Sequence, residues 1–353
     1  MQSIFSSVFS PLFSAEGILP VLWYVILGVA VFAYSLGEGF DLGISSIYFL
    51  SKTEEDRRRL LNSIGPVWDG NEVWLIIVVA GMFAGFPSAY ALLLSIFYMP
   101  IWSFVTMLIL RGVSLEFRSK SESKRWKLFW DVSFSISGTL IAFFLGALLG
   151  NLLMGLPIAL DISYAQVSWA LFFRPYAVLC GLLVVFAYSV HGACFSLIKV
   201  DGDLENRIAQ RFSRLVSVFL ALLLTAVVVT TLKLRDILSG SGYPVMIGCA
   251  LISCLSVISS VKKVKQTRYC KAFLFSTVNL ISLVISSGVM LFPNLLRSTV
   301  SSDFSLNIYN SAVEAKTLKV LLLIVLLGLP FVIAYAVYVY RVFRGKTDFK
   351  SIY

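Results

Sequence analysis

Two acidic residues interrupt the first long apolar stretch of the sequence, which covers residues 18–50. Glu38 and Asp41 lie three residues apart within the segment 37–43, GEGFDLG. On a helix this spacing places both carboxylates on one face, so we expect them to point into the protein together. The three glycines of the segment allow a neighbouring helix to approach closely. Carboxylates placed in this way can relay protons or form buried ion pairs.

A second polar constellation lies in the segment 62–75, NSIGPVWDGNEVWL. Pro66 and Gly70 are expected to shape the entry of a helix. Asp69 suits this position, because free backbone N–H groups and the helix dipole favour an anion there. Farther along the chain, Arg111 ends one apolar stretch and Asp131 opens the next.

A charged side chain at bilayer depth costs about 2.5 to 3.5 kcal/mol on insertion scales, so it must be paired or sheltered. We therefore expect residues from four helices to form one buried polar cluster: Glu38, Asp41, Asp69, Arg111 and Asp131. Two interpretations stay open. The cluster is either a structural ion-pair network that fixes helix packing, or part of a proton pathway.

The composition indicates that lipid is the solvent of the elements that carry these residues. Of the 353 residues, 58% are hydrophobic and only 14% are charged, and the mean hydropathy is +0.88. The sequence predicts an all-α integral membrane protein with nine spans, at residues 18–50, 73–86, 90–110, 129–153, 169–198, 215–232, 245–260, 273–291 and 318–340. The second would rise only about 21 Å, so it must extend upstream through Trp68 and Asp69.

Basic residues predict the orientation of these spans. They gather in alternate connections and at the end of the chain: 57–59, 118–127, 207–214, 262–271 and 341–346. Because cytoplasmic loops are enriched in Lys and Arg, we expect the N-terminus outside and the C-terminus in the cytoplasm. Nine spans fit opposite termini, and eight remain an alternative. The formal charge of +10 is spread over these short clusters, so no nucleic-acid partner is expected.

The sequence predicts one polytopic membrane domain over residues 1–353. Residues 1–16 contain no Lys or Arg, so the first apolar segment is expected to stay in the mature protein rather than act as a signal peptide. The five cysteines show no CxxC spacing and His191 is the only histidine. We therefore expect no metal site, no multi-haem core within this chain, and a packing role for His191.

Several segments together resemble subunit II of the cytochrome bd family of quinol oxidases. They are the two polar segments quoted above, and 111–120 (RGVSLEFRSK), 150–157 (GNLLMGLP) and, more loosely, 340–346 (YRVFRGK). The matches are collinear and span nearly the whole chain. Some positions depart from the family pattern: Glu38 stands where Asp is common, Val67 replaces a His, Gly112 replaces a Pro, and Tyr309 with Asn310 replaces a Trp-Asp pair.

The resemblance implies two four-helix bundles plus one peripheral helix in a bacterial cytoplasmic membrane. It also implies a partner, subunit I, that carries haem b and haem d, oxidises quinol and reduces oxygen to water. No catalytic residue is then expected in this chain. By position, Asp69 matches an acid implicated in proton supply, and Trp68 and Trp74 lie in the segment associated with oxygen access or the partner interface. A structural quinone or lipid in this chain, and a small third subunit, are compatible with the resemblance.

A second class of protein also fits the acids within the membrane. Proton-coupled secondary transporters combine midspan acids with broken helices. A transporter needs neither haem nor a second membrane subunit, so the two interpretations predict different partners.

Overall fold

Long apolar helices form most of the chain in the computed structural model, which describes residues 15–159, 169–234 and 242–347. The long helices are α2 (Ala15–Ile47), α4 (Trp68–Gly85), α6 (Tyr98–Phe117), α7 (Lys124–Met154), α9 (Pro175–Lys199), α10 (Gly202–Leu234), α11 (Gly242–Lys265), α12 (Tyr269–Leu291) and α13 (Ala315–Val342). The N-terminal residues 1–14, on which the signal-peptide argument rests, lie outside the described part.

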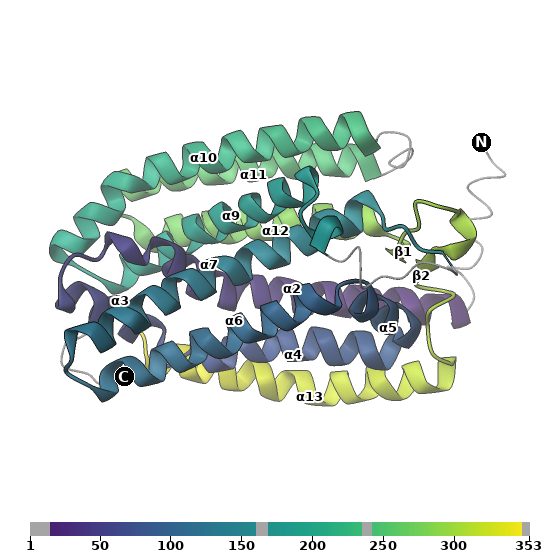
Figure 1. Cartoon of the computed structure of the whole chain (residues 1–353), viewed down its shortest axis with the longest axis horizontal. Helices are drawn as coiled ribbons and strands as arrows, with labels where there is room; N and C mark the ends of the chain where they lie inside the picture. Colours follow the sequence, from purple (N-terminus) through teal and green to yellow (C-terminus); the bar gives the residue numbers. More distant parts are fainter. Residues whose placement is uncertain (1–14, 160–168, 235–241, 348–353) are drawn as a thin grey trace.

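Within the described ranges, eight helices are long and apolar enough to cross a membrane by themselves. The number rises to nine when α3 (Glu54–Ile64) and α4, which meet at a bend of 48°, are counted together as one span. In Figure 1, α2 begins and α13 ends at opposite ends of the molecule, which requires an odd number of crossings. The predicted all-α membrane architecture is confirmed. The start of α4 at Trp68 also confirms the upstream extension of the second span.

Two predicted spans have different boundaries in the structure, and one of them, 169–198, is a continuous helix only from Pro175, where α9 begins. The stretch 90–110 is divided at Phe97 into α5 (Pro87–Ile96) and α6. Pro100 lies in the first turn of α6, where its missing N–H breaks no helical hydrogen bond. The short α5 therefore connects α4 to α6.

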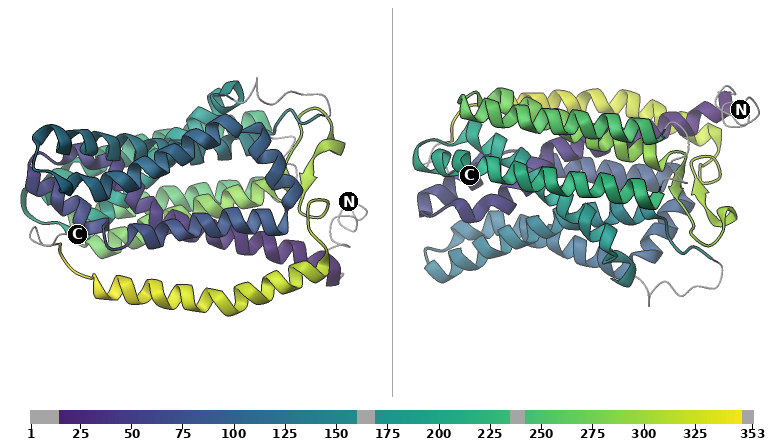
Figure 2. Two further views of the ribbon diagram at one scale, coloured as in Figure 1. Left: turned by 60° about the horizontal axis from the view of Figure 1, so that its bottom comes forward. Right: turned by 90° about the horizontal axis from the view of Figure 1, so that it is seen from above.

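Three helices, α2, α7 and α9, pack against one another in the interior (Figure 1). α4 packs on α2, α6 on α7, and α10 and α12 on α9, while α11 lies against α10 and α12. α13 contacts α2 and α4 along the edge of the molecule (Figure 2), and most of its surface is exposed in this chain. The division into two four-helix bundles remains a prediction.

Glycine permits the tightest of these contacts. A Cβ atom on Gly43 of α2 would lie 1.9 Å from the backbone oxygen of Tyr188 on α9. A Cβ on Gly37 would lie 2.7 Å from the Asn71 side-chain oxygen on α4. The expectation that glycines in the segment 37–43 admit close neighbours is confirmed.

A small hairpin closes the end of the molecule opposite α3 (Figure 1). Strand β1 (Asn294–Leu296) pairs antiparallel with β2 (Leu306–Asn307), and the 3-10 helix η4 (Ser302–Phe304) lies between them. Arg297 donates from Nη2 to the carbonyls of Leu153 and Met154 at the end of α7, at 3.1 and 2.8 Å. Because the last carbonyls of a helix have no partner within it, this arginine completes the end of α7.

Candidate functional site

Glu38 and Asp41 point together into the interior from α2, and both are fully buried. Arg111, near the end of α6, is also 0% exposed and lies between them. Its Nη1 is 2.6 Å from Glu38 Oε1, and its Nη2 is 3.9 Å from Asp41 Oδ2. We call these three residues the buried acid cluster. Three of the five predicted site residues therefore come together.

Two further side chains extend the buried acid cluster toward α4 and α13. Asn71 Nδ2 donates to Asp41 Oδ2 at 2.8 Å, and Tyr340 Oη donates to Asn71 Oδ1 at 2.7 Å. Neither residue was predicted as part of the site. Asn71 had a signal, because it lies inside the distinctive segment 62–75 next to Asp69. Tyr340 begins the loosely matching segment 340–346, but nothing in the sequence indicates that the last helix passes this point.

Charge is unbalanced in the buried acid cluster. Two carboxylates share one guanidinium, which leaves one negative charge without a cationic partner. The Arg111 Nε atom and the hydroxyl of the nearby Tyr34 have no hydrogen-bond partner among the described residues. An uncompensated buried charge is costly, so a proton held by the cluster would lower its energy.

The tryptophans of the segment 62–75 differ in their contacts. The Arg111 guanidinium lies over the Trp68 ring, 5.8 Å from its centroid, a distance at which cation and ring attract. Trp68 therefore belongs to the wall of the buried acid cluster. Trp74, farther along α4, is half-buried.

Asp69 is exposed in the isolated chain, in the first turn of α4. This placement contradicts the prediction of one cluster that contains all five residues. The physical reason is the helix start: the free N–H groups of the first turn of α4 favour an anion there, while Asn71, two residues on, faces Asp41. Glu72, beside them, is half-buried.

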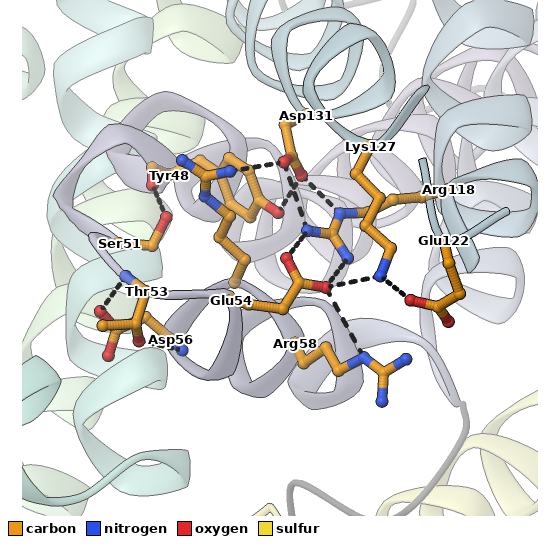
Figure 3. A network of polar contacts seen from close by, with 11 residues as sticks. Tyr48, Ser51, Thr53, Glu54, Asp56, Arg58, Arg118, Glu122, Lys127 and Asp131 are labelled. Carbon is orange, nitrogen blue, oxygen red and sulfur yellow. Dashed lines mark hydrogen bonds and ion pairs between the residues drawn. The ribbon is translucent and has the colours of Figure 1, made fainter. Parts of the chain in front are cut away.

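Asp131 is also absent from the buried acid cluster and forms a separate network (Figure 3). Its carboxylate accepts from Tyr48 Oη at 2.5 Å, from Arg118 Nε at 2.5 Å and from Arg57 Nη1 at 3.0 Å. Glu54 joins the same network through Arg118 at 2.8 Å and Lys127 at 3.5 Å. We call these residues the rim network.

The rim network forms where it does because α3 brings its own charges to α7. A capping box formed by Thr53 and Asp56 starts α3, and Glu54 and Arg57 follow within its first turns. Asp131 is only 5% exposed, and a buried carboxylate requires such partners. The correction to the predicted cluster is thus that Asp131 is satisfied locally, by Arg57 of α3 together with Tyr48 and Arg118.

The single histidine does not provide a haem ligand set. His191 is fully buried on α9. Its Nδ1 lies 2.8 Å from Ser276 Oγ and its Nε2 lies 3.1 Å from the Leu36 carbonyl oxygen. The ring stacks on Phe273 with centroids 4.6 Å apart. Both nitrogens are engaged within the protein, so the residues here do not fit an axial haem site, and the predicted packing role is confirmed.

Comparison with known proteins identifies the family. A sequence profile described as "Cytochrome bd terminal oxidase subunit II" matches residues 19–343. The chain is 30% identical to the cytochrome bd ubiquinol oxidase subunit 2 of Bacillus subtilis, with 94% of this chain and 97% of that protein covered. It is 25% identical to the cytochrome bd-I ubiquinol oxidase subunit 2 of Escherichia coli, with 95% and 97% covered.

The fold is shared with a solved structure. The bd oxidase from Geobacillus thermodenitrificans contains a chain with 18% sequence identity and a TM-score of 0.74, and the match covers 92% of this chain and 98% of that one. The resemblance found in the sequence is confirmed, and the transporter interpretation is set aside. The chain belongs to the family of subunit II of the cytochrome bd terminal oxidases, the membrane-bound, oxygen-reducing quinol oxidases of bacteria.

Proposed function

We propose that this chain shelters a haem-bearing subunit I and supplies protons to it from the cytoplasmic side through Asp69 and the buried acid cluster. The observation that supports this most directly is the excess of one carboxylate over cations among Glu38, Asp41 and Arg111, all 0% exposed. A site that is stable with one bound proton can release and regain it at little cost, which a fully paired network cannot do.

The partner face that fits this function is the side formed by α4, α6 and α13. Asp69 is exposed there at the start of α4, and a carboxylate facing lipid would be costly. Large apolar side chains of α4 and α6 are exposed on the same helices, among them Ile76, Phe83, Trp102 and Ile109. Subunit I would bury Asp69 together with these side chains, and Trp68 and Trp74 would then line the interface or an oxygen route.

The other expectations for the complex follow from the same proposal. The haems b and d reside in subunit I, since His191 is engaged elsewhere. The N-terminus lies outside and the C-terminus lies in the cytoplasm, as the basic connections predict. Quinol is oxidised by the complex, and the proposal is compatible with a structural quinone or lipid in this chain and with a small third subunit. On this proposal, catalysis in the strict sense takes place in the partner.

The test is the variant Asp69→Asn in the complete oxidase, which keeps the size of the side chain and removes its proton-binding oxygen. We expect oxygen consumption per haem to fall by about 100-fold or more, the loss typical when a positioned proton-transfer group is removed, with an unchanged haem spectrum. Asp303→Asn is a matched control, because Asp303 is an exposed acid in the hairpin at the opposite end.

Two results would contradict the proposal in different ways. Normal turnover with a normal haem spectrum in Asp69→Asn would remove the proton pathway. Loss of haem or of subunit I would show that Asp69 holds the interface and acts as a structural acid only.

A further inference from the structure

An open groove of about 520 Å³ lies between α10 and α11, away from the residues discussed above. Ser213, Ser217 and Leu220 line it from α10, and Ile258, Lys262 and Lys265 from α11. The lysines stand at one end, in the last turn of α11, and the apolar side chains continue toward the middle of the span. The groove is therefore amphipathic along the membrane normal, with cations at its mouth and an apolar floor.

The mouth of the groove has an excess of positive charge. The last turn of α11 contains Lys262, Lys263 and Lys265, and Arg211 and Arg214 flank the groove residue Ser213 in the sequence of α10. Asp236 is the only acid in the sequence between Arg207 and Asp303. The ion pairs nearby use other cations: Arg207 binds Asp56, and Lys346 binds Glu205. Among the residues that the structure describes, neither Lys262 nor Lys265 forms an ion pair with a carboxylate.

The shape and charge of the groove select an amphiphile with an anionic head. Inorganic phosphate would match the lysines and the hydroxyls of Ser213 and Ser217 but would leave the apolar floor uncovered. A neutral lipid would cover the floor and leave the lysines unpaired. We propose that this groove is a binding site for an anionic phospholipid, with its phosphate at Lys262 and Lys265 and an acyl chain along Leu220 and Ile258.

The position of the groove suits a lipid. α10 and α11 lie on the opposite side of the molecule from α4 and α13 (Figure 1), so a partner on the α4 side leaves the groove open to the bilayer. Leu224 on α10 and Leu255 on α11 are both 66% exposed. They extend the apolar surface beyond the groove, where the rest of an acyl chain would lie. The proposal is independent of the proton pathway.

The decisive variant is Lys262→Gln/Lys265→Gln in the complete, delipidated oxidase, titrated with dioleoylphosphatidylglycerol under native mass spectrometry. Each lysine near an anionic headgroup contributes about fivefold in affinity, so we expect about 25-fold weaker binding of the tightest phosphatidylglycerol. Dioleoylphosphatidylcholine should bind weakly to both forms. Lys316→Gln/Lys319→Gln is the matched control, with the same residue types and spacing on α13, outside this groove, and it should bind like the wild type.

A second variant separates the groove from charge alone. Ser217→Phe keeps both lysines and fills the space between the helices, so it should weaken phosphatidylglycerol binding as strongly as the double lysine variant. Three results would overturn the proposal: unchanged affinity in either variant, equal binding of phosphatidylcholine by the wild type, or displacement of the lipid by millimolar inorganic phosphate. Photocrosslinking of residues 258–266 to another polypeptide of the purified complex would also overturn it, because a protein would then occupy the groove.

Discussion

The buried acid cluster and the rim network contain the same kinds of residue and differ in how completely these residues are paired. In the rim network, Asp131 accepts from three donors and Arg118 donates to two carboxylates. In the buried acid cluster, two carboxylates depend on Arg111 alone for positive charge. A network in which every charge is paired fixes helices in place, whereas a network with an unpaired carboxylate can bind a proton. The same side chains thus serve stability in one place and chemistry in the other.

The largest effect is expected from the loss of the only cation in the buried acid cluster. Arg111→Met leaves Glu38 and Asp41 buried without a counter-charge, which costs about 3 to 5 kcal/mol. We expect little assembled complex, measured as the haem-containing fraction on gel filtration. Arg111→Met/Glu38→Gln should recover part of the assembly, because only one acid remains. Full assembly of the single variant would show that both acids are neutral in the resting protein.

The next effect distinguishes the two networks by turnover. Glu38→Gln removes the unbalanced charge while Arg111 and Asp41 remain as a pair. The oxidase should assemble normally, and its oxygen consumption should fall by about 100-fold or more, as expected when a proton-transfer group is lost. Oxygen consumption per haem is the measurement. A rate equal to that of the wild type would make the buried acid cluster structural, like the rim network.

The opposite pattern is expected in the rim network. Asp131→Asn weakens the contacts of Tyr48, Arg57 and Arg118, and the loss of charge-assisted hydrogen bonds costs about 2 to 3 kcal/mol. The purified complex should unfold at a lower temperature with an unchanged rate per intact haem. A selective fall in turnover, at wild-type thermal stability, would place Asp131 in the proton pathway and break the distinction between the networks.

The smallest effect concerns the link between the buried acid cluster and the last helix. Tyr340→Phe removes one hydrogen bond to Asn71, worth about 1 kcal/mol. The complex should show a small decrease in thermal stability and retain its haem. Tyr338→Phe on the same helix is the control, since Tyr338 is 66% exposed. Equal effects of the two variants would mean that the bond to Asn71 contributes nothing.

The sequence predicted what depends on local composition and spacing. Apolar length gave the spans, and the three-residue spacing of Glu38 and Asp41 correctly placed both on one buried face. The prediction of the site was wrong where a neighbouring element determines the partners of a side chain. Arg57 of α3 joins Tyr48 and Arg118 around Asp131, so the predicted cluster divides. Tyr340 contacts Asn71 from 269 positions away in the sequence. Such long-range contacts have no local signal in the sequence. The break at Phe97 did have a local signal, which was Pro100.

The shared guanidinium of the buried acid cluster has a consequence for biosynthesis. Arg111 is translated 70 residues after Asp41, so α2 enters the bilayer before its counter-charge exists. Two ionised acids would then cost about 5 to 7 kcal/mol on insertion scales. The nascent α2 must therefore enter with its acids protonated or wait beside the insertion machinery until α6 emerges. By either route, α2, the first span, completes its membrane integration only when α6, the third span, has been made.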